Sequence, residues 1–263
     1  MTDSLLLTHD RRGVGRITLN RPEVHNAFNE DLINALDEAI DTLACNAAVR
    51  VVVMAGNGKS FSAGADLNWM KRTADYDFAE NSIDALRFGE MLGRFASMPK
   101  PVVGAIQGPA YGGGVGLVAA CDIVIASEAA AFMLSEVKLG LIPAMISPYV
   151  VRAIGARQAR RYFLSAERID PATACVLGLV HEVVADGELE ATVDAMVTRL
   201  LKNSPAAMAA SKDLIYAVSD RPTDRAVIKD TAQRIAEARA SADGREGIAA
   251  FLEKRKPVWP EQG

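Results

Sequence analysis

The chain has 263 residues, of which 50% are hydrophobic and 24% charged, with a formal net charge of −4. This length and composition fit one large globular domain, or one domain with a smaller appendage. Because no long basic block occurs, the sequence argues against nucleic acid or an anionic membrane surface as the main partner. No segment approaches about 20 uninterrupted apolar residues, so we expect no membrane span.

The cysteines and the first residues bear on the compartment. Cys45, Cys121 and Cys175 are odd in number and show no CxxC spacing, which predicts buried free thiols in a reducing compartment. The opening "MTDSLLLTHDRRG" lacks the charged start and apolar run of a secretory signal. We therefore expect a cytoplasmic location.

The first part of the chain alternates predicted strands and helices. Val14–Asn20 is typical of a strand that ends before Pro22, and Asn29 can cap a helix that runs to about Ala44. The nearly all-apolar, β-branched run Val49–Gly56 indicates a strand covered on both faces.

The next predicted elements continue this alternation. They are a helix over 78–98, a buried strand over 101–108, a short helix fed by the glycines of 112–121, a strand over 122–127, two helical pieces within 157–178 and a final strand near 180–184. From Leu189 onward the pattern is helical, with Ser204 as a cap, Pro205 at the first helical position, and further helices over 223–242 and 245–256. We therefore predict an α/β domain over 1–200 and a helical region over 201–263.

Two glycine-bearing turns, Ser60–Leu67 ("SFSAGADL") and Ala110–Leu117 ("AYGGGVGL"), each follow a buried strand. Glycine lets the backbone approach a ligand, and N–H groups at the start of a helix have no helical partner. Two such turns side by side can aim two N–H groups at one oxygen, as in an oxyanion hole. The alternative is tight packing of helix against strand.

Other kinds of site fit these turns less well. The phosphate-loop motif GxxxxGK[ST] is absent, and "GGGVG" does not have the dinucleotide-binding spacing in its usual context. No His, Cys, Asp and Glu cluster has metal-ligand spacing, and the serine-hydrolase motif GxSxG is missing. We expect no metal site.

Four segments carry a family resemblance: "FSAGADLNWM", "KPVVGAIQGPAYGGGVGLVAACDIVIAS", "FMLSEVKLGLIPA" and "GIAAFLEKRKPVW". In this order, over nearly the whole chain, the sequence resembles the crotonase, or enoyl-CoA hydratase/isomerase, superfamily. Within it, "ADLNWMKR" and "GLIPAMISPYVV" are similar to bacterial hydratases of branched or carboxylated enoyl-CoAs. Examples are the methylglutaconyl-CoA hydratase of leucine degradation and the isohexenylglutaconyl-CoA hydratase of acyclic terpene breakdown.

The resemblance implies an α/β fold built as a crotonase-type spiral of ββα repeats, with a C-terminal α-helical region used for trimerisation. Trimers of this family often pair into hexamers. The implied substrate is an acyl-CoA thioester, so coenzyme A enters as part of the substrate, with no metal or redox cofactor.

The resemblance also assigns catalytic roles by position. The backbone N–H groups of Ala65 and Gly113 would form the oxyanion hole around the thioester oxygen. Glu136, in "LSEVKLG", would be the general acid and base, and apolar neighbours would raise the pKa of its carboxyl. Without the resemblance, a surface glutamate beside Lys138 would be the simpler interpretation.

Gly116 departs from the family pattern, because two-glutamate hydratases carry their second catalytic glutamate there. Several interpretations stay open: Glu136 does both proton transfers, or a substrate carboxylate or ordered water replaces the missing group. The enzyme could instead be a Δ3,Δ2-enoyl-CoA isomerase with one glutamate, or an inactive acyl-CoA-binding member. Gly116 could also make room for a branched acyl chain.

Two further sets of residues follow from the resemblance. Coenzyme A contacts are predicted for Val24, His25, Ala27, Ala63, Ala65, Asp66 and Leu67, with Phe251 and Lys254 contributed by the tail of a neighbouring subunit. Residues 69–78 are predicted either to line the acyl end of the pocket or to serve as core or lid without touching the substrate. Pro143 and "AMISPY" are predicted to shape the far wall.

Overall fold

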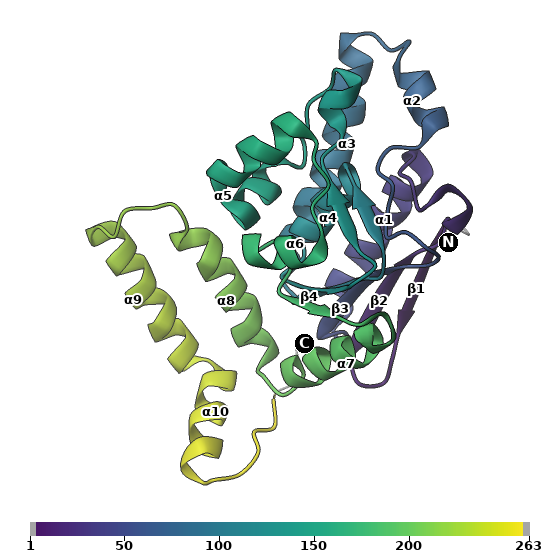
Figure 1. Ribbon diagram of the computed structural model, residues 1–263. Helices are drawn as coiled ribbons and strands as arrows, with labels where there is room; N and C mark the ends of the chain where they lie inside the picture. Colours follow the sequence, from purple (N-terminus) through teal and green to yellow (C-terminus); the bar gives the residue numbers. More distant parts are fainter. Residues whose placement is uncertain (1–3, 260–263) are drawn as a thin grey trace.

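The computed structural model describes residues 4–259, and its centre is a six-stranded sheet (Figure 1). In spatial order its strands are β1 (Leu5–His9), β2 (Val14–Leu19), β3 (Val51–Gly56), β4 (Val102–Ile106), β6 (Ile123–Ser127) and β8 (Glu182–Val184). The β1–β2 pair is antiparallel, and the other neighbours are parallel. A small second sheet pairs β5 (Pro109–Tyr111) with β7 (Ala131–Met133). The predicted α/β class is confirmed.

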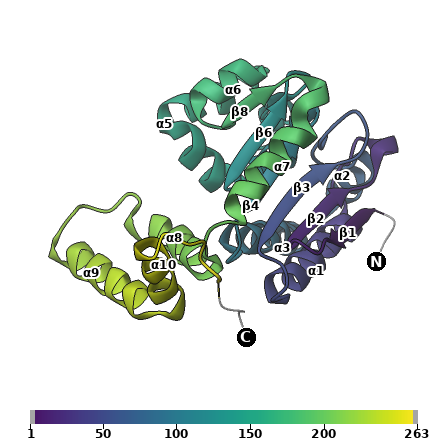
Figure 2. The same ribbon diagram turned by 90° about the horizontal axis from the view of Figure 1, so that it is seen from below.

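Helices cover both faces of the large sheet. On one face lie α1 (Glu30–Cys45) and α3 (Phe78–Ser97), and on the other lies α7 (Leu189–Leu200) (Figure 2). The other helices are α2 (Leu67–Thr73), α4 (Gly113–Ala119), α5 (Ser147–Ser165), α6 (Pro171–Leu177), α8 (Pro205–Val218), α9 (Arg225–Ala240) and α10 (Ala242–Leu252). Short 3-10 turns cover Pro22–Val24, Glu136–Leu139 and Asp186–Glu188.

Strand β3 shows why its sequence is apolar throughout. Val52 and Met54 belong to the core under α1 and α3, whereas Val51 and Val53 belong to the smaller core under α7. Successive side chains of a strand point to opposite faces, so a strand with helices on both sides needs apolar residues at every position.

The predicted helix starts are confirmed at two caps. The side chain of Asn29 accepts a hydrogen bond from the Leu32 N–H, and that of Ser204 accepts one from the Ala207 N–H. Strand β1, helix α2 and the sheet of β5 and β7 were not predicted. These elements are three to seven residues long, too short for a hydrophobic period to stand out.

The prediction of buried thiols is wrong for two of the three cysteines. All are free, but Cys45 is exposed and Cys175 is partly buried, leaving only Cys121 fully inside. Cys45 is the last residue of α1, where the helix leaves the core. Nothing in the local sequence distinguishes it from a core position.

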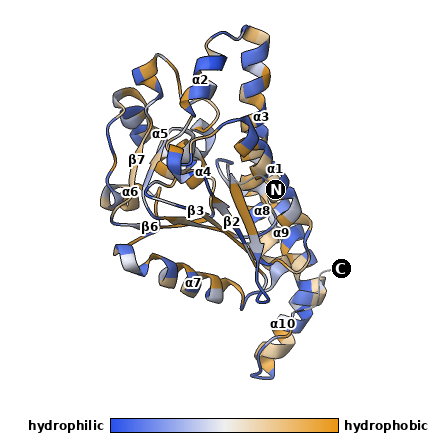
Figure 3. Cartoon of the chain, turned by 90° about the vertical axis from the view of Figure 1, so that its right-hand side faces the viewer, coloured by the Kyte–Doolittle hydropathy of each residue, from blue (hydrophilic) through white to orange (hydrophobic). Residues whose placement is uncertain are grey.

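The C-terminal helices α8, α9 and α10 extend away from the sheet (Figures 1 and 2). Helix α8 is tied to the body by an ion pair between Lys212 and Asp122, 2.7 Å apart, and by a hydrogen bond from the Tyr216 hydroxyl to the Ala96 carbonyl. Hydrophobic residues are interspersed along these helices (Figure 3), and several are exposed: Ile215, Ile228, Ile235, Ile248, Phe251 and Leu252.

Candidate active site

The first glycine turn is held against the residues before α1. The Phe28 N–H donates to the Gly64 carbonyl at 2.7 Å, and the Asp66 N–H donates to the Phe28 carbonyl at 2.8 Å. These two bonds flank Ala65. Because successive peptide groups of an extended segment point to opposite sides, the Ala65 N–H faces away from Phe28.

The second glycine turn begins α4. The Gly112 N–H donates to the Met133 carbonyl at 2.9 Å, and Gly112 has a positive φ of 49°, which favours glycine. Gly113 is the first helical residue, so its N–H has no partner within the helix. Among the backbone hydrogen bonds of residues 4–259, neither the Ala65 nor the Gly113 N–H is recorded as a donor.

The two turns lie side by side. Ser62 forms an isolated parallel bridge with Ala110, and the Tyr111 N–H donates to the Ser62 carbonyl at 2.8 Å. A methyl group added at Gly64 would lie 2.9 Å from the Tyr111 carbonyl oxygen, and one added at Gly114 would lie 2.8 Å from the Ser62 carbonyl oxygen. The backbones approach as closely as they do because side chains are missing there.

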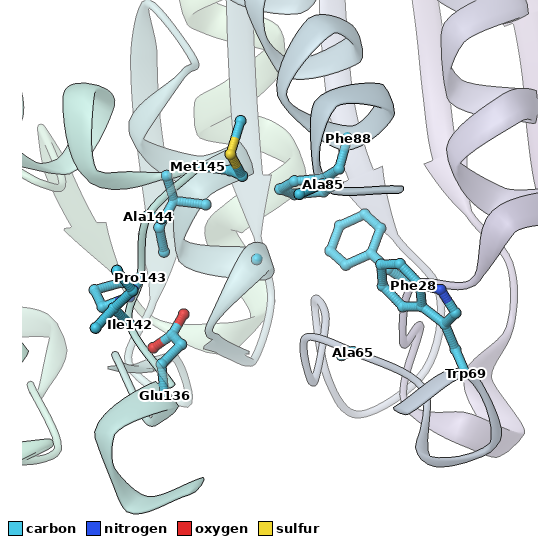
Figure 4. Close-up of a pocket in the computed structure, with 12 residues that line it drawn as sticks. Phe28, Ala65, Trp69, Ala85, Phe88, Glu136, Ile142, Pro143, Ala144 and Met145 are labelled. Carbon is cyan, nitrogen blue, oxygen red and sulfur yellow. The ribbon is translucent and has the colours of Figure 1, made fainter. Parts of the chain in front are cut away.

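Both turns open onto one cavity of about 270 Å³. Its lining residues are Phe28, Ala65, Trp69, Ala85, Phe88, Gly113, Glu136, Ile142, Pro143, Ala144, Met145 and Ile146. Figure 4 shows Glu136 and residues 142–145 on one side, with Phe28, Ala65 and Trp69 on the other. The structure thus brings together the three predicted catalytic positions, residues 65, 113 and 136, around one pocket.

Glu136 is the one titratable side chain among the twelve lining residues. Its Oε2 atom is buried and has no hydrogen-bond partner within the described chain. Its Oε1 atom lies beside the second turn, 3.3 Å from where a methyl group on Gly112 would stand. Burial raises the pKa of the Glu136 carboxyl, since the charged form loses hydration. This agrees with the direction expected for the pKa of this carboxyl.

Gly116 does not line the cavity, because Ile146 covers it. A methyl group on Gly116 would lie 2.1 Å from Cγ2 and 2.7 Å from Cβ of Ile146, and 3.5 Å from Cδ2 of Leu92. Gly116 therefore does not open onto the cavity itself, and the prediction that it makes room for a branched acyl chain could hold only through the seating of Ile146, which does line the cavity. A larger side chain at 116 would require Ile146 to move.

The N-terminal group of predicted coenzyme A contacts falls into exposed and buried members. Val24, His25, Ala63, Ala65 and Leu67 reach solvent. Ala27 and Asp66 are buried, so Ala27 can offer only backbone atoms. His25 has its Nδ1 atom 3.0 Å from the Ser60 hydroxyl oxygen, which positions it beside the first turn.

The Asp66 side chain is occupied within the protein. It accepts hydrogen bonds from the Asn68 and Trp69 N–H groups at the start of α2, and it pairs with Arg21 at 2.9 Å. Although burial raises the pKa of this carboxyl, these hydrogen bonds and the guanidinium bring it below its usual value. Asp66 therefore fixes the turn that carries Ala65.

Phe251 and Lys254 lie far from the cavity of their own chain. Helix α10 is at the opposite end of the molecule from α2 in both ribbon views (Figures 1 and 2). The Phe251 side chain is 83% exposed. Neither residue lines the cavity of its own chain, and their contact with a substrate bound to a neighbouring copy stays a prediction.

The pocket walls were predicted in part. Trp69 and residues 143–146 line the cavity as expected, but Phe78 does not and is 90% exposed. Phe28, Ala85, Phe88 and Ile142 were missed. Phe28 and Phe88 meet edge to face with ring centroids 5.4 Å apart. In sequence they look like ordinary core residues, and nothing there distinguishes them as pocket walls.

Two properties of residues 4–259 bear on other classes of protein. No cluster of three or more His, Cys, Asp or Glu side chains could hold a metal ion in this part of the chain. Within the same residues, no helix is both long and apolar enough to cross a bilayer.

Comparisons with known proteins give matches over nearly the whole chain. Residues 9–262 match the enoyl-CoA hydratase/isomerase family. The chain is 34% identical to 2,3-dehydroadipyl-CoA hydratase of Escherichia coli, covering 97% of this chain and 98% of that protein. It is 32% identical to a short-chain-enoyl-CoA hydratase of Clostridium acetobutylicum, covering 92% of each.

A solved structure, an enoyl-CoA hydratase from Shewanella pealeana, superposes with a TM-score of 0.94 at 43% identity, covering 97% of this chain and 96% of that one. The fold, the paired glycine turns and the whole-chain match lead to one conclusion. The chain belongs to the enoyl-CoA hydratase/isomerase family, the crotonase superfamily.

Proposed function

We propose that the protein is an enoyl-CoA hydratase that adds water to a 2-enoyl-CoA, with Glu136 as general acid and base. The observation that carries this is the unpartnered, buried Oε2 atom of Glu136 in the cavity to which Ala65 and Gly113 also belong. The relatives named as hydratases support the same reaction.

The N–H groups of Ala65 and Gly113 would bind the thioester oxygen. When water adds to the β-carbon, negative charge moves onto that oxygen, and two fixed donors stabilise it. Loss of one such donor typically costs about 3–4 kcal/mol of transition-state stabilisation. Because both donors belong to the backbone, their positions depend on the packing of the two turns.

Glu136 would make both proton transfers. As a carboxylate it takes a proton from the attacking water, and as an acid it gives a proton to the α-carbon. Its raised pKa suits the second step, since a carboxyl that holds its proton more tightly is a better acid–base partner near neutral pH.

Δ3,Δ2-enoyl-CoA isomerisation is the second candidate, and Gly116 favours it. Ile146 covers Gly116, so the cavity offers one titratable group and no second carboxylate to activate water. A single carboxylate suffices to move a proton from the α-carbon to the γ-carbon of a 3-enoyl thioester. An inactive acyl-CoA-binding protein fits less well, because the half-buried Glu136 lines the cavity with a buried, unpartnered Oε2 atom and a raised carboxyl pKa.

We favour a branched, uncharged acyl group over a carboxylated one. Among the twelve residues that line the cavity none is Lys or Arg, and the walls are aliphatic or aromatic apart from Glu136. An anionic acyl end would be desolvated without a cation to pair with it. The resemblance to hydratases of methylglutaconyl-CoA and isohexenylglutaconyl-CoA keeps the carboxylated substrates in the test below.

The same proposal includes an assembly. The exposed apolar residues of α8–α10 would be covered in a homotrimer, or in a hexamer made of two trimers. Phe251 and Lys254 of a neighbouring copy would then reach coenzyme A. Sedimentation velocity of the full chain, with and without an acyl-CoA, measures this assembly.

The reaction is tested with a panel of straight, branched and carboxylated enoyl-CoAs. A hydratase removes the absorbance of the conjugated thioester from 2-enoyl-CoAs. If that absorbance persists while 3-enoyl-CoAs gain it, the isomerase is correct and the hydratase is excluded. No change with any member would leave only acyl-CoA binding.

A further inference from the structure

We infer that Met145, seated in a notch at Gly89, sets the depth of the acyl pocket and selects acyl chains by length and branching. This inference rests on the proposed acyl-CoA substrate. It concerns a wall of the pocket that takes no part in the proton transfers.

The notch lies in the middle of helix α3. A methyl group on Gly89 would lie 2.1 Å from Cε of Met145, so the end of the methionine side chain occupies the space that any other residue at 89 would fill. Glycine inside a helix costs about 1 kcal/mol relative to alanine. The absence of a side chain at position 89 therefore lowers the stability of the helix, and the Met145 side chain from the pocket wall fills the space.

Met145 also faces the cavity. It is half-buried, it lines the cavity beside Ile146, and α3 contributes Ala85 and Phe88 to the same cavity. Figure 4 shows Met145 on the wall opposite Phe28 and Trp69. With its methyl group inside the notch, the side chain lies back against α3 and leaves the cavity open.

Methionine suits this position because it is unbranched and has three rotatable side-chain bonds. If the notch is filled, the Sδ–Cε end must swing away from α3. Since Met145 forms part of the cavity wall, the displaced end shortens the cavity. One methylene in a hydrophobic pocket changes discrimination by about tenfold or more.

Gly93 provides a matched control. It lies one turn further along the same helix, and a methyl group there would meet the Tyr149 hydroxyl oxygen at 3.6 Å, an ordinary contact distance. Gly89→Ala and Gly93→Ala therefore make the same change in helix propensity, but only the first displaces a pocket residue.

The experiment measures dissociation constants of saturated acyl-CoAs by calorimetry, from acetyl-CoA through butyryl- and isovaleryl- to octanoyl-CoA. Gly89→Ala is expected to weaken octanoyl-CoA binding about tenfold or more while leaving acetyl-CoA within about twofold. Gly93→Ala should keep the parent profile. The double variant Gly89→Ala, Met145→Ala should bind octanoyl-CoA as the parent does, because the obstructing side chain is gone.

The inference would be overturned if Gly89→Ala changed the dissociation constants of acetyl-CoA and octanoyl-CoA equally, or changed neither. It would also be overturned if the double variant still bound octanoyl-CoA weakly. Saturated acyl-CoAs do not react, so the outcome is independent of the reaction. If the parent protein binds the saturated acyl-CoAs but converts no enoyl-CoA, only the proposed reaction is contradicted. If it binds none of them, the proposed reaction and the inference about Met145 are both contradicted.

Discussion

The glycines around the pocket fall into two groups that differ in what they face. Gly64 and Gly114 face backbone carbonyls of the opposite turn, at 2.9 and 2.8 Å from an added methyl group. Gly89 and Gly116 face side chains, Met145 and Ile146. The first group sets the distance between the two turns and leaves no space for an added side chain. The second group seats side chains that line the acyl pocket, and each of its glycines can be substituted together with its partner side chain.

Glu136→Gln tests the proton transfers proposed for the pocket that both groups of glycines adjoin. It should have the largest effect on the rate. The amide can neither take nor give the proton, so kcat/KM for the best enoyl-CoA should fall about 10³-fold or more. Butyryl-CoA affinity, measured in parallel, should stay near the parent value. Equal rates for the variant and the parent would contradict the role of Glu136.

Gly114→Ala tests the group that faces backbone. Its methyl group would push the Ser62 carbonyl away and separate the Ala65 and Gly113 N–H groups, so kcat should fall about 10²-fold. Gly187→Ala is the control, because a methyl group there meets nothing within 4 Å. If Gly114→Ala reacts as fast as Gly187→Ala, the turns are less tightly coupled than the packing indicates.

Gly116→Ala tests the group that faces side chains. Overpacking against Ile146 should destabilise the fold by about 1–3 kcal/mol, partly offset by about 1 kcal/mol of helix propensity. In an Ile146→Ala background the closest contact, with Cγ2 at 2.1 Å, is gone, but Cβ stays 2.7 Å from the added methyl group, so the same substitution should cost less than in the parent without becoming free. Urea unfolding of the four proteins gives the coupling free energy, and a value near zero would contradict the contact.

The pH dependence of stability should show the smallest effect. Burial raises the pKa of Glu136 in the folded protein, whereas the unfolded chain has the ordinary value of about 4.3. As pH rises past that value the unfolded state binds fewer protons than the folded state, so this group lowers the stability until the folded carboxyl also ionises. The unfolding free energy of Glu136→Gln should gain on that of the parent as the pH rises above about 4, and the gain should level off once the folded carboxyl has ionised. A constant difference would mean that the carboxyl is not perturbed.

The two groups of glycines also differ in how far the sequence reveals them. The turns at 60–67 and 110–117 could be predicted, because glycine after a buried strand is a local signal. Glu136 was singled out only by the family resemblance, since its local sequence alone favours a surface glutamate. The match of Ile146 to Gly116, and of Met145 to Gly89, could not. Those partners are tens of residues apart, and each looks unremarkable until helix packing brings it to its glycine.

The fold shows the same division. Helix α1 can be predicted from its hydrophobic periodicity, and strand β3 from an unbroken run of apolar, mostly β-branched residues. The bridge between Ser62 and Ala110 depends on two extended segments of a few residues meeting in space. It nevertheless aligns the two turns, so the feature that determines the site most directly is the one with the weakest sequence signal.

The position of α10 has a consequence for measurements in dilute solution. Phe251 and Lys254 of one copy are proposed to complete the coenzyme-binding surface of another. In that case a protomer released from its neighbours keeps Glu136 and both turns but loses part of its binding surface for the nucleotide portion of coenzyme A. Apparent substrate affinity would then vary with enzyme concentration while the chemical step did not.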